Sequence, residues 1–452
     1  MTAAPASTSA DGGAIHVWVA IADVSAYVVP GSAMDREAYA RATSVYFPGR
    51  VLPMLPEVLS NGLCSLRPNE DRLTLVAEFL VHPNGDVSHE KFYPATICSQ
   101  ARLTYQLVRR MVVDREPIIR SEYEPLLPSL ELLSKAARYL KEARGRRGNI
   151  DFDLPEPEIV LDLTGGIENI LKRGRDWSHQ IIEHLMIAAN EAVARFLTKQ
   201  KQLCVYRVHE GPDVNKIRNF HNVAQILGSK GPFLMPPQGI HLNKIVSGFE
   251  GKPAERLVNT LLLRSMSQAV YTFENLGHFG LASECYCHFT SPIRRYPDLM
   301  VHRALKSTLV RSYDRTLVKK EKISNERTSV PEYQSTSPDH CSRMERRSME
   351  AEREMLKLHS ALFMQDKVGE VFEGIVSHIT RFGLFLELKD YFVEGLLPVE
   401  NLTDDFYVFD ETHLKYTGKR RKKTYQIGTP MTLQLVEVNL TDRQIRFGLT
   451  KK

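Results

Sequence analysis

Two adjacent arginines, Arg294 and Arg295, stand directly before a predicted helix and could bind an anion. Ser291-Pro292 marks a turn, and Pro297 suits the first helical position because its missing N–H costs nothing there. The start of a helix favours anions, because it presents unpaired N–H groups and the positive end of the helix dipole. Two guanidinium groups beside such a helix start predict a phosphate clamp. The alternative is that each arginine pairs with a buried carboxylate.

A possible metal site precedes this turn, in the strand-like run 278–287 that ends in Cys285-Tyr286-Cys287 and is followed by His288. Strand alternation places the two cysteines on one face and His288 on the other, and no second ligand pair has zinc spacing. We therefore expect these cysteines to pack in the core. Six cysteines in 452 residues are typical of reduced thiols, which indicates a cytoplasmic protein.

The elements that must position the arginines alternate between helices and strands through residues 16–310, which predicts an α+β fold. A near-continuous apolar run at 16–27 predicts a buried strand, in which Asp23 needs a polar partner. Asn84-Gly85 predicts a hairpin between strands 73–81 and 87–97. A helix over 129–144 is expected to end in a basic, glycine-broken loop at 144–148.

From residue 367 the pattern changes to short alternating strands, which predict a small OB-fold β-barrel over 367–450. Aromatic and histidine side chains flank its glycines and are candidates for stacking on bases. A basic run in a long loop would attract a phosphate backbone. The predicted stacking residues are Phe372, His378, Phe382 and Phe385, and the basic run is Lys419, Arg420, Arg421, Lys422 and Lys423.

The overall composition limits the possible partners. The net charge of +5 allows a polyanion as a partner without requiring one. No apolar run approaches the length of a membrane span, so we expect no membrane partner. Residues 1–15 have neither the basic start nor the apolar core of a signal peptide, and we expect them to form a disordered leader.

Three motifs, at Thr43–Pro48, Leu59–Leu66 and Phe289–Leu299, occur in the order and rough spacing of one protein family. Through them the sequence resembles the RNB family of 3′→5′ exoribonucleases, and the resemblance covers about residues 16–449. It implies an RNB catalytic-type domain over 16–366, followed by the OB-fold domain as an RNA-binding module. The implied partner is single-stranded RNA, which family members degrade to nucleoside 5′-monophosphates.

The resemblance also implies roles for individual residues. Arg294 and Arg295 match the catalytic motif, and Tyr46 matches a tyrosine that stacks on RNA near its 3′ end. Phe152, after the basic stretch, is the candidate for a second stacking aromatic. Glu183 and Asn190 match a further RNA-binding motif, although His184 replaces that motif's second acid.

The resemblance further implies magnesium, which the family binds through an aspartate cluster, D-x5-D-x-D-D, ahead of the strand at Val17. By the family spacing the last aspartate falls near position 3, where this chain reads Met1 to Pro5; Asp11 is the only acid before Val17. We therefore assign no metal ligand, and expect an N-terminally truncated chain with a possible upstream fragment that carries the aspartates. Two functions stay open: an exoribonuclease that lacks this segment, or a catalytically inactive RNA-binding protein on the same scaffold.

Overall fold

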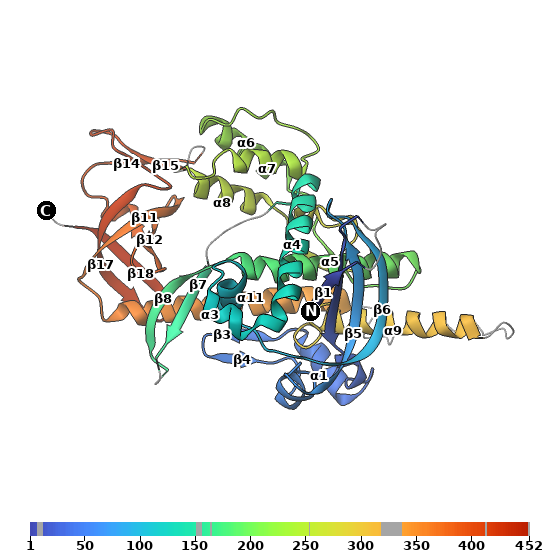
Figure 1. The fold of residues 1–452 in the computed structure, drawn as a ribbon. Coiled ribbons are helices and arrows are strands. Elements are labelled where there is room, and N and C mark those ends of the chain that lie inside the picture. Colours follow the sequence, from blue (N-terminus) through green and yellow to red (C-terminus); the bar gives the residue numbers. More distant parts are fainter. Residues whose placement is uncertain are drawn as a thin grey trace.

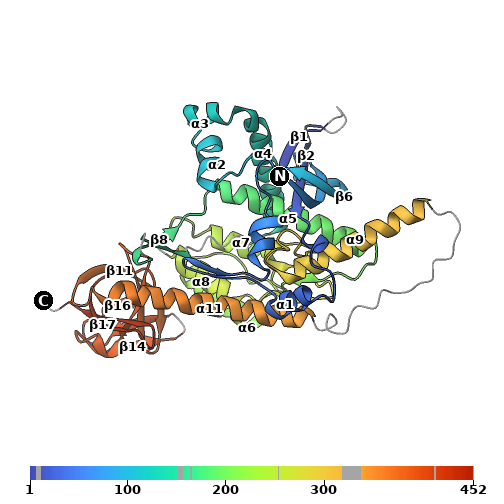
Figure 2. The same cartoon turned by 90° about the horizontal axis from the view of Figure 1, so that it is seen from below.

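The computed structural model describes residues 1–6, 12–150, 156–162, 165–252, 254–317, 337–411 and 414–450. A mixed body of helices and sheets carries a β-barrel at one end, and the long helix α11 (Ser337–Gln365) runs from the body to the barrel (Figures 1 and 2). The expected α+β fold with a C-terminal OB-type barrel is confirmed.

The main sheet of the body is antiparallel and has the strand order β1-β2-β5-β6. The predicted hairpin at Asn84-Gly85 joins its two long strands. Residues 2–5, which we expected to belong to a disordered leader, instead form the edge strand β1, because their backbone pairs with β2 and Ala3 packs into the core. The strands are β1 (Thr2–Pro5), β2 (Ile15–Ala22), β5 (Asp71–Val81) and β6 (Val87–Cys98).

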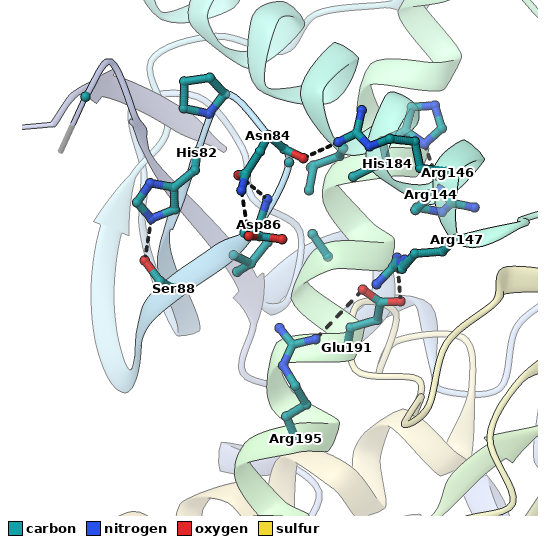
Figure 3. A pocket seen from close by; sticks show the side chains of 17 residues that line it. His82, Asn84, Asp86, Ser88, Arg144, Arg146, Arg147, His184, Glu191 and Arg195 are labelled. Carbon is teal, nitrogen blue, oxygen red and sulfur yellow. Dashed lines mark hydrogen bonds and ion pairs between the residues drawn. The ribbon is translucent and has the colours of Figure 1, made fainter.

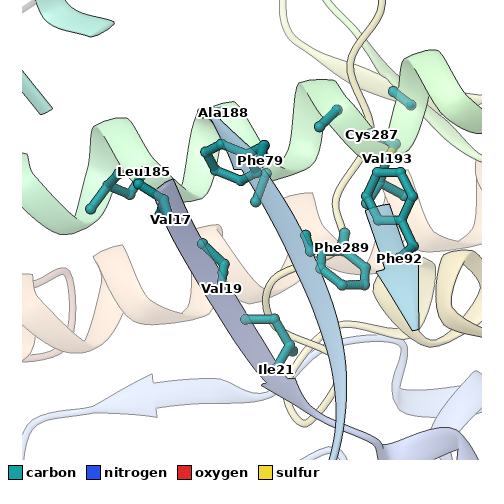
Figure 4. Packing of buried hydrophobic residues seen from close by; sticks show 14 of the residues in the cluster. Val17, Val19, Ile21, Phe79, Phe92, Leu185, Ala188, Val193, Cys287 and Phe289 are labelled. Carbon is teal, nitrogen blue, oxygen red and sulfur yellow. The ribbon is translucent and has the colours of Figure 1, made fainter. Parts of the chain in front are cut away.

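The core of the body lies between this sheet and helix α5 (Trp177–Lys199), which crosses one face of the sheet (Figure 4). Alternate residues of β2, such as Val17 and Val19, point into this core. Cys285 and Cys287 belong to the same cluster, so their expected packing role is confirmed. The segment around them is not the regular strand that the sequence suggests; in this part of the chain only isolated bridges occur, and Gly277 and Ala282 adopt left-handed backbone angles that interrupt an extended chain.

Helix α4 (Leu127–Arg147) continues through the stretch that we expected to be a basic loop. Arginine is a good helix former and a single glycine costs only about 1 kcal/mol, so Gly145 does not end the helix. The helix ends instead at Gly148, whose φ is +96°. A side chain there would also collide with the backbone, because a Cβ would lie 2.5 Å from the nitrogen of Ile240.

The C-terminal barrel is closed in the order β11-β12-β13-β18-β17, and a three-stranded sheet, β14-β15-β16, is inserted between β13 and β17. Closure removes the open sheet edges and surrounds a dry core. The strands are β11 (Val371–Thr380), β12 (Gly383–Leu388), β13 (Glu394–Pro398), β14 (Tyr407–Asp410), β15 (Lys415–Gly418), β16 (Thr424–Gln426), β17 (Pro430–Asn439) and β18 (Gln444–Leu449).

The barrel is attached to the body by α11 and by the hairpin β7–β8 (Glu156–Leu161 and Ile167–Arg173). Ile170 of this hairpin is fully buried in the barrel's apolar cluster, and its carbonyl accepts a hydrogen bond of 2.9 Å from the backbone N–H of Phe392. The barrel therefore shares packing with the body as well as the chain connection.

No helix in the described ranges is long and apolar enough to cross a membrane. The remaining helices and strands surround the core. They are α1 (Ala33–Arg41), β3 (Val45–Phe47), β4 (Arg50–Leu52), α2 (Tyr105–Val112), α3 (Pro117–Glu122), β9 (Tyr206–Val208), α6 (Val214–Ile226), α7 (Gly239–Ser247), α8 (Glu255–Ser265), β10 (Val270–Thr272) and α9 (Tyr296–Leu317). Short 3-10 turns and the π-helical turn Val58–Leu63 connect some of them.

Candidate nucleic-acid interface

The turn before α9 is held by one buried carboxylate. Asp298 is fully buried in the first turn of α9, and its Oδ1 accepts hydrogen bonds from the backbone N–H of Ser291 (2.7 Å) and from Nη2 of Arg295 (2.8 Å). Burial alone would lower the pKa of Arg295, but the Asp298 carboxylate, together with Tyr271 and Tyr286, raises that pKa above its ordinary value. Arg295 therefore pairs with a buried carboxylate, which is the alternative to a phosphate clamp that the sequence left open.

Arg294 has a different environment. Its side chain is exposed and makes no ion pair with any other residue that the structure describes. Its carbonyl accepts hydrogen bonds from the backbone N–H of Ser44 (3.0 Å) and from the Thr43 hydroxyl (3.3 Å), and Thr43 also forms a β-bridge with Arg295. The arginine turn thus lies against residues 43–44, about 250 positions earlier in the sequence.

Tyr46 follows this contact directly, on the short hairpin β3–β4. Its side chain is 46% exposed, and in the hairpin Tyr46 pairs with Val51. Its backbone N–H donates to Oε1 of Glu352 on α11 (2.8 Å). The structure therefore brings the exposed aromatic, the arginine turn and α11 together, although they are far apart in the sequence.

A polar layer behind the turn fixes α11 to the body. Arg207 of β9 forms an ion pair of 2.5 Å with Glu345 of α11 and lies 4.6 Å from the ring centroid of Tyr271. The Tyr271 hydroxyl lies 2.8 Å from Nδ1 of His288. The backbone N–H of Tyr271 donates to the hydroxyl of Ser342 on α11. Burial, helped by Arg295, lowers the pKa of His288 well below its ordinary value, so this histidine is neutral at pH 7.

Helix α5 carries Glu183 and Asn190, which the resemblance assigns to RNA binding. Asn190 is 3% exposed; its amide donates to the Tyr286 hydroxyl (3.0 Å) and accepts from the backbone N–H of Phe289 (2.9 Å). It therefore positions the segment that leads into the arginine turn and is not available to a ligand. Glu183 is partly exposed and pairs with Arg175 at 2.7 Å. Phe152 lies outside the described residues.

The four expected stacking residues of the barrel differ in exposure. Phe372 is 6% exposed and packs inside the barrel, so it cannot stack on a base from solvent. Phe382 is 72% exposed, while Phe385 is half-buried and stacks on His378 with ring centroids 5.8 Å apart. Burial and the nearby Arg264 lower the pKa of His378 to about 4, which keeps its ring neutral at pH 7.

The basic run lies in the tight turn between β15 and β16, where we expected a long loop. The backbone N–H groups of Arg420 (3.0 Å) and Arg421 (2.6 Å) donate to the Asp405 carboxylate, which closes the turn. Nζ of Lys423 lies 3.4 Å from Asp404, and all five basic side chains of the run are exposed. The turn is closed by backbone hydrogen bonds, and its basic side chains are exposed, with Lys423 paired to Asp404.

The described residues do not fit a magnesium site. None of the described parts of the chain contains a group of three or more His, Cys, Asp or Glu side chains that could hold a metal. Asp23, the one acid inside the predicted first strand region, is buried and engaged by Lys306 (2.5 Å) and by the Ser25 hydroxyl (2.7 Å). Asp23 thus has the polar partners that its place in a buried strand requires.

Removing the carboxylate that pairs with Arg295 should cost far more stability than removing the exposed Arg294 side chain. We expect Asp298→Ala to lower the free energy of unfolding by about 3–5 kcal/mol, because it leaves the Arg295 guanidinium buried without its carboxylate. Arg294→Ala should change it by no more than about 0.5 kcal/mol, since that side chain is exposed. Chemical denaturation measures both values. Similar destabilisation by the two substitutions would contradict the structural division between Arg295 and Arg294.

Comparison with known proteins matches two domain families, one after the other, along the chain. The profile of the RNB domain matches residues 3–311, and the profile of the S1 RNA binding domain matches residues 365–450. The chain is 41% identical over 444 residues to ribonuclease R of Escherichia coli (strain K12), which covers 97% of this chain and 54% of that protein. It is also 41% identical to ribonuclease R of Aquifex aeolicus, with 97% of this chain and 61% of that protein covered.

Solved structures of similar fold include ribonuclease R bound to RNA. Mycoplasma genitalium RNase R in complex with ribose methylated single-stranded RNA has a TM-score of 0.88 and 31% identity, with 99% of this chain and 68% of that chain covered. The same enzyme in complex with double-stranded RNA gives a TM-score of 0.83 at 29% identity, over 99% of this chain and 72% of that chain. This chain spans about half the length of the Escherichia coli relative. Because the RNB profile covers more than half of the sequence, the chain belongs to the RNB family.

Proposed function

We propose that this chain holds the 3′ end of single-stranded RNA at Tyr46 and Arg294, as part of a ribonuclease R-like 3′→5′ exoribonuclease. The observation that carries the proposal is the hydrogen bonding of residues 43–44 to the backbone of Arg294. It places the chain segment that carries the exposed Tyr46 beside the turn that carries Arg294, whose exposed side chain has no ion pair in the described chain. Such a pair can stack on a base and bind its phosphate at the same time.

The barrel supplies a second contact in this proposal. Phe382 and Phe385 offer ring surface to bases, and the basic turn between β15 and β16 attracts the phosphate backbone. The match to an S1 RNA binding domain supports this assignment, as does the RNA bound to the Mycoplasma genitalium enzyme. The RNA would then contact the barrel upstream of the 3′ end that Tyr46 and Arg294 hold.

Hydrolysis is a separate question from binding. RNB nucleases generally use magnesium, which prefers oxygen ligands such as clustered carboxylates. No such cluster occurs in the described ranges, and this favours a second candidate function: RNA binding without hydrolysis. The two candidates share the same RNA-binding face and differ only in the chemical step.

Tyr46→Ala should weaken the binding of a short single-stranded RNA by about tenfold, because stacking on one base contributes ~1–3 kcal/mol. Fluorescence anisotropy with a labelled oligoribonucleotide measures the dissociation constant. The matched control is Tyr105→Ala, since Tyr105 is 44% exposed, close to the 46% of Tyr46, but lies on α2. Equal losses in the two variants, or no loss in either, would remove Tyr46 from the RNA site.

The hydrolysis experiment separates the two candidate functions. We expect the chain to bind a 5′-labelled oligoribonucleotide without shortening it, whether magnesium or a chelator is present, because the described residues hold no metal site. A second protein carries a D-x5-D-x-D-D segment ahead of residue 1 and should shorten the RNA only with magnesium. Chelator-sensitive decay by the chain without this segment would show that its own residues bind the metal.

A further inference from the structure

A cavity lies between the end of α4, the middle of α5 and the β5–β6 turn (Figure 3). The cavity has a volume of about 1040 Å³, and neither Tyr46 nor Arg294 lines it. Four arginines do, against two carboxylates. The arginines are Arg144, Arg146, Arg147 and Arg195, and the carboxylates are Asp86 and Glu191.

Glu191 accounts for two of these arginines. It is 5% exposed and lies between Arg147 (3.3 Å) and Arg195 (3.9 Å), as Figure 3 shows. Arg195 also forms an ion pair of 2.5 Å with Glu90. The charges of Arg147 and Arg195 are thus balanced within the protein, which leaves Arg144 and Arg146.

Arg144 is a buried cation without an ion pair in the described chain. It is 4% exposed, and its guanidinium donates to two neutral acceptors, Nδ1 of His184 (2.7 Å) and Oδ1 of Asn149 (2.8 Å). Its Nε is buried and has no hydrogen-bond partner among the described residues. Burial lowers the pKa of Arg144. The negative charge of Glu191 acts in the opposite direction, but Glu191 forms no hydrogen bond or ion pair with Arg144. Burying a charge without a paired counter-charge is energetically costly, so a bound anion would stabilise the buried Arg144 guanidinium.

Arg146 adds a second guanidinium at the rim. Its side chain is exposed, and it donates to the backbone carbonyl of Asn84 in the β5–β6 turn. No carboxylate in the described chain pairs with it. Arginines in the last turn of a helix also stabilise the negative end of the helix dipole, but this does not explain why Arg144 is withdrawn from water.

We propose that this cavity binds a phosphate group, held by the guanidinium groups of Arg144 and Arg146. Guanidinium forks match the geometry of phosphate oxygens, and a phosphate would supply the counter-charge that Arg144 does not find among the described residues. A cavity of about 1040 Å³ has room for a whole nucleotide. The phosphate comes either from a free mononucleotide or from the backbone of RNA. The proposal does not depend on RNA binding at Tyr46, because the two sites share no residue.

The test uses the full chain and three probes: inorganic phosphate, adenosine 5′-monophosphate and a single-stranded oligoribonucleotide. Isothermal titration calorimetry measures each affinity for the wild type, Arg146→Glu and Arg218→Glu. Arg146 is exposed, so its substitution should leave the fold intact, and the unliganded melting temperature checks this. Arg218 is an exposed arginine of α6 that does not line the cavity, and its substitution makes the same change in charge.

We expect Arg146→Glu to weaken phosphate binding by about tenfold or more, because it removes a charged hydrogen-bond donor and adds a negative charge. Arg218→Glu should have little effect. Loss of affinity for phosphate and the mononucleotide identifies a free nucleotide as the source. A loss seen only with the oligoribonucleotide identifies the RNA backbone. The proposal is overturned if no probe binds, or if Arg146→Glu and Arg218→Glu reduce every affinity equally.

Discussion

The buried ion pair between Arg295 and Asp298 is the interaction on which the rest of the site depends. One carboxylate oxygen of Asp298 accepts hydrogen bonds from both the Arg295 guanidinium and the backbone N–H of Ser291. These two bonds close the turn at the start of α9. In the closed turn the Arg294 carbonyl accepts a hydrogen bond from the backbone N–H of Ser44. Tyr46 lies two residues after Ser44, so this bond also helps to place Tyr46. Arg295 is therefore paired inside the protein, whereas the side chain of its neighbour Arg294 is exposed.

The same region connects the body to the barrel. Helix α11 hydrogen-bonds Tyr46 through Glu352 and then runs to the barrel. The tip of the β3–β4 hairpin lies close to β7, because a Cβ on Gly49 would come within 2.6 Å of the Leu161 side chain. The hairpin β7–β8 in turn buries Ile170 in the barrel core. The two proposed RNA contacts are thus held by packed elements, which fixes the distance that a bound strand must span.

Much of the fold follows from sequence pattern, and the errors have identifiable physical causes. Alternation and turn residues predicted the barrel and the Asn84-Gly85 hairpin, since both are local signals. The basic stretch after residue 144 was misjudged because one glycine does not end a helix that packing supports. Burial of Phe372 could not be read from an alternating strand, which has two faces that only the closed barrel distinguishes. The link from Glu352 to Tyr46 spans about 300 residues, so no local pattern could indicate it.

The central claim is that Tyr46 and Arg294 hold the same end of one RNA strand. A double-mutant cycle tests it most directly, with Tyr46→Ala, Arg294→Ala and the double variant titrated with a single-stranded oligoribonucleotide. If both residues grip one terminal nucleotide, losing either one frees that nucleotide, and the two losses should not add. The account predicts a coupling energy of about 0.5–3 kcal/mol. Losses that add to within about 0.3 kcal/mol would mean that the two residues act independently, and would contradict the account.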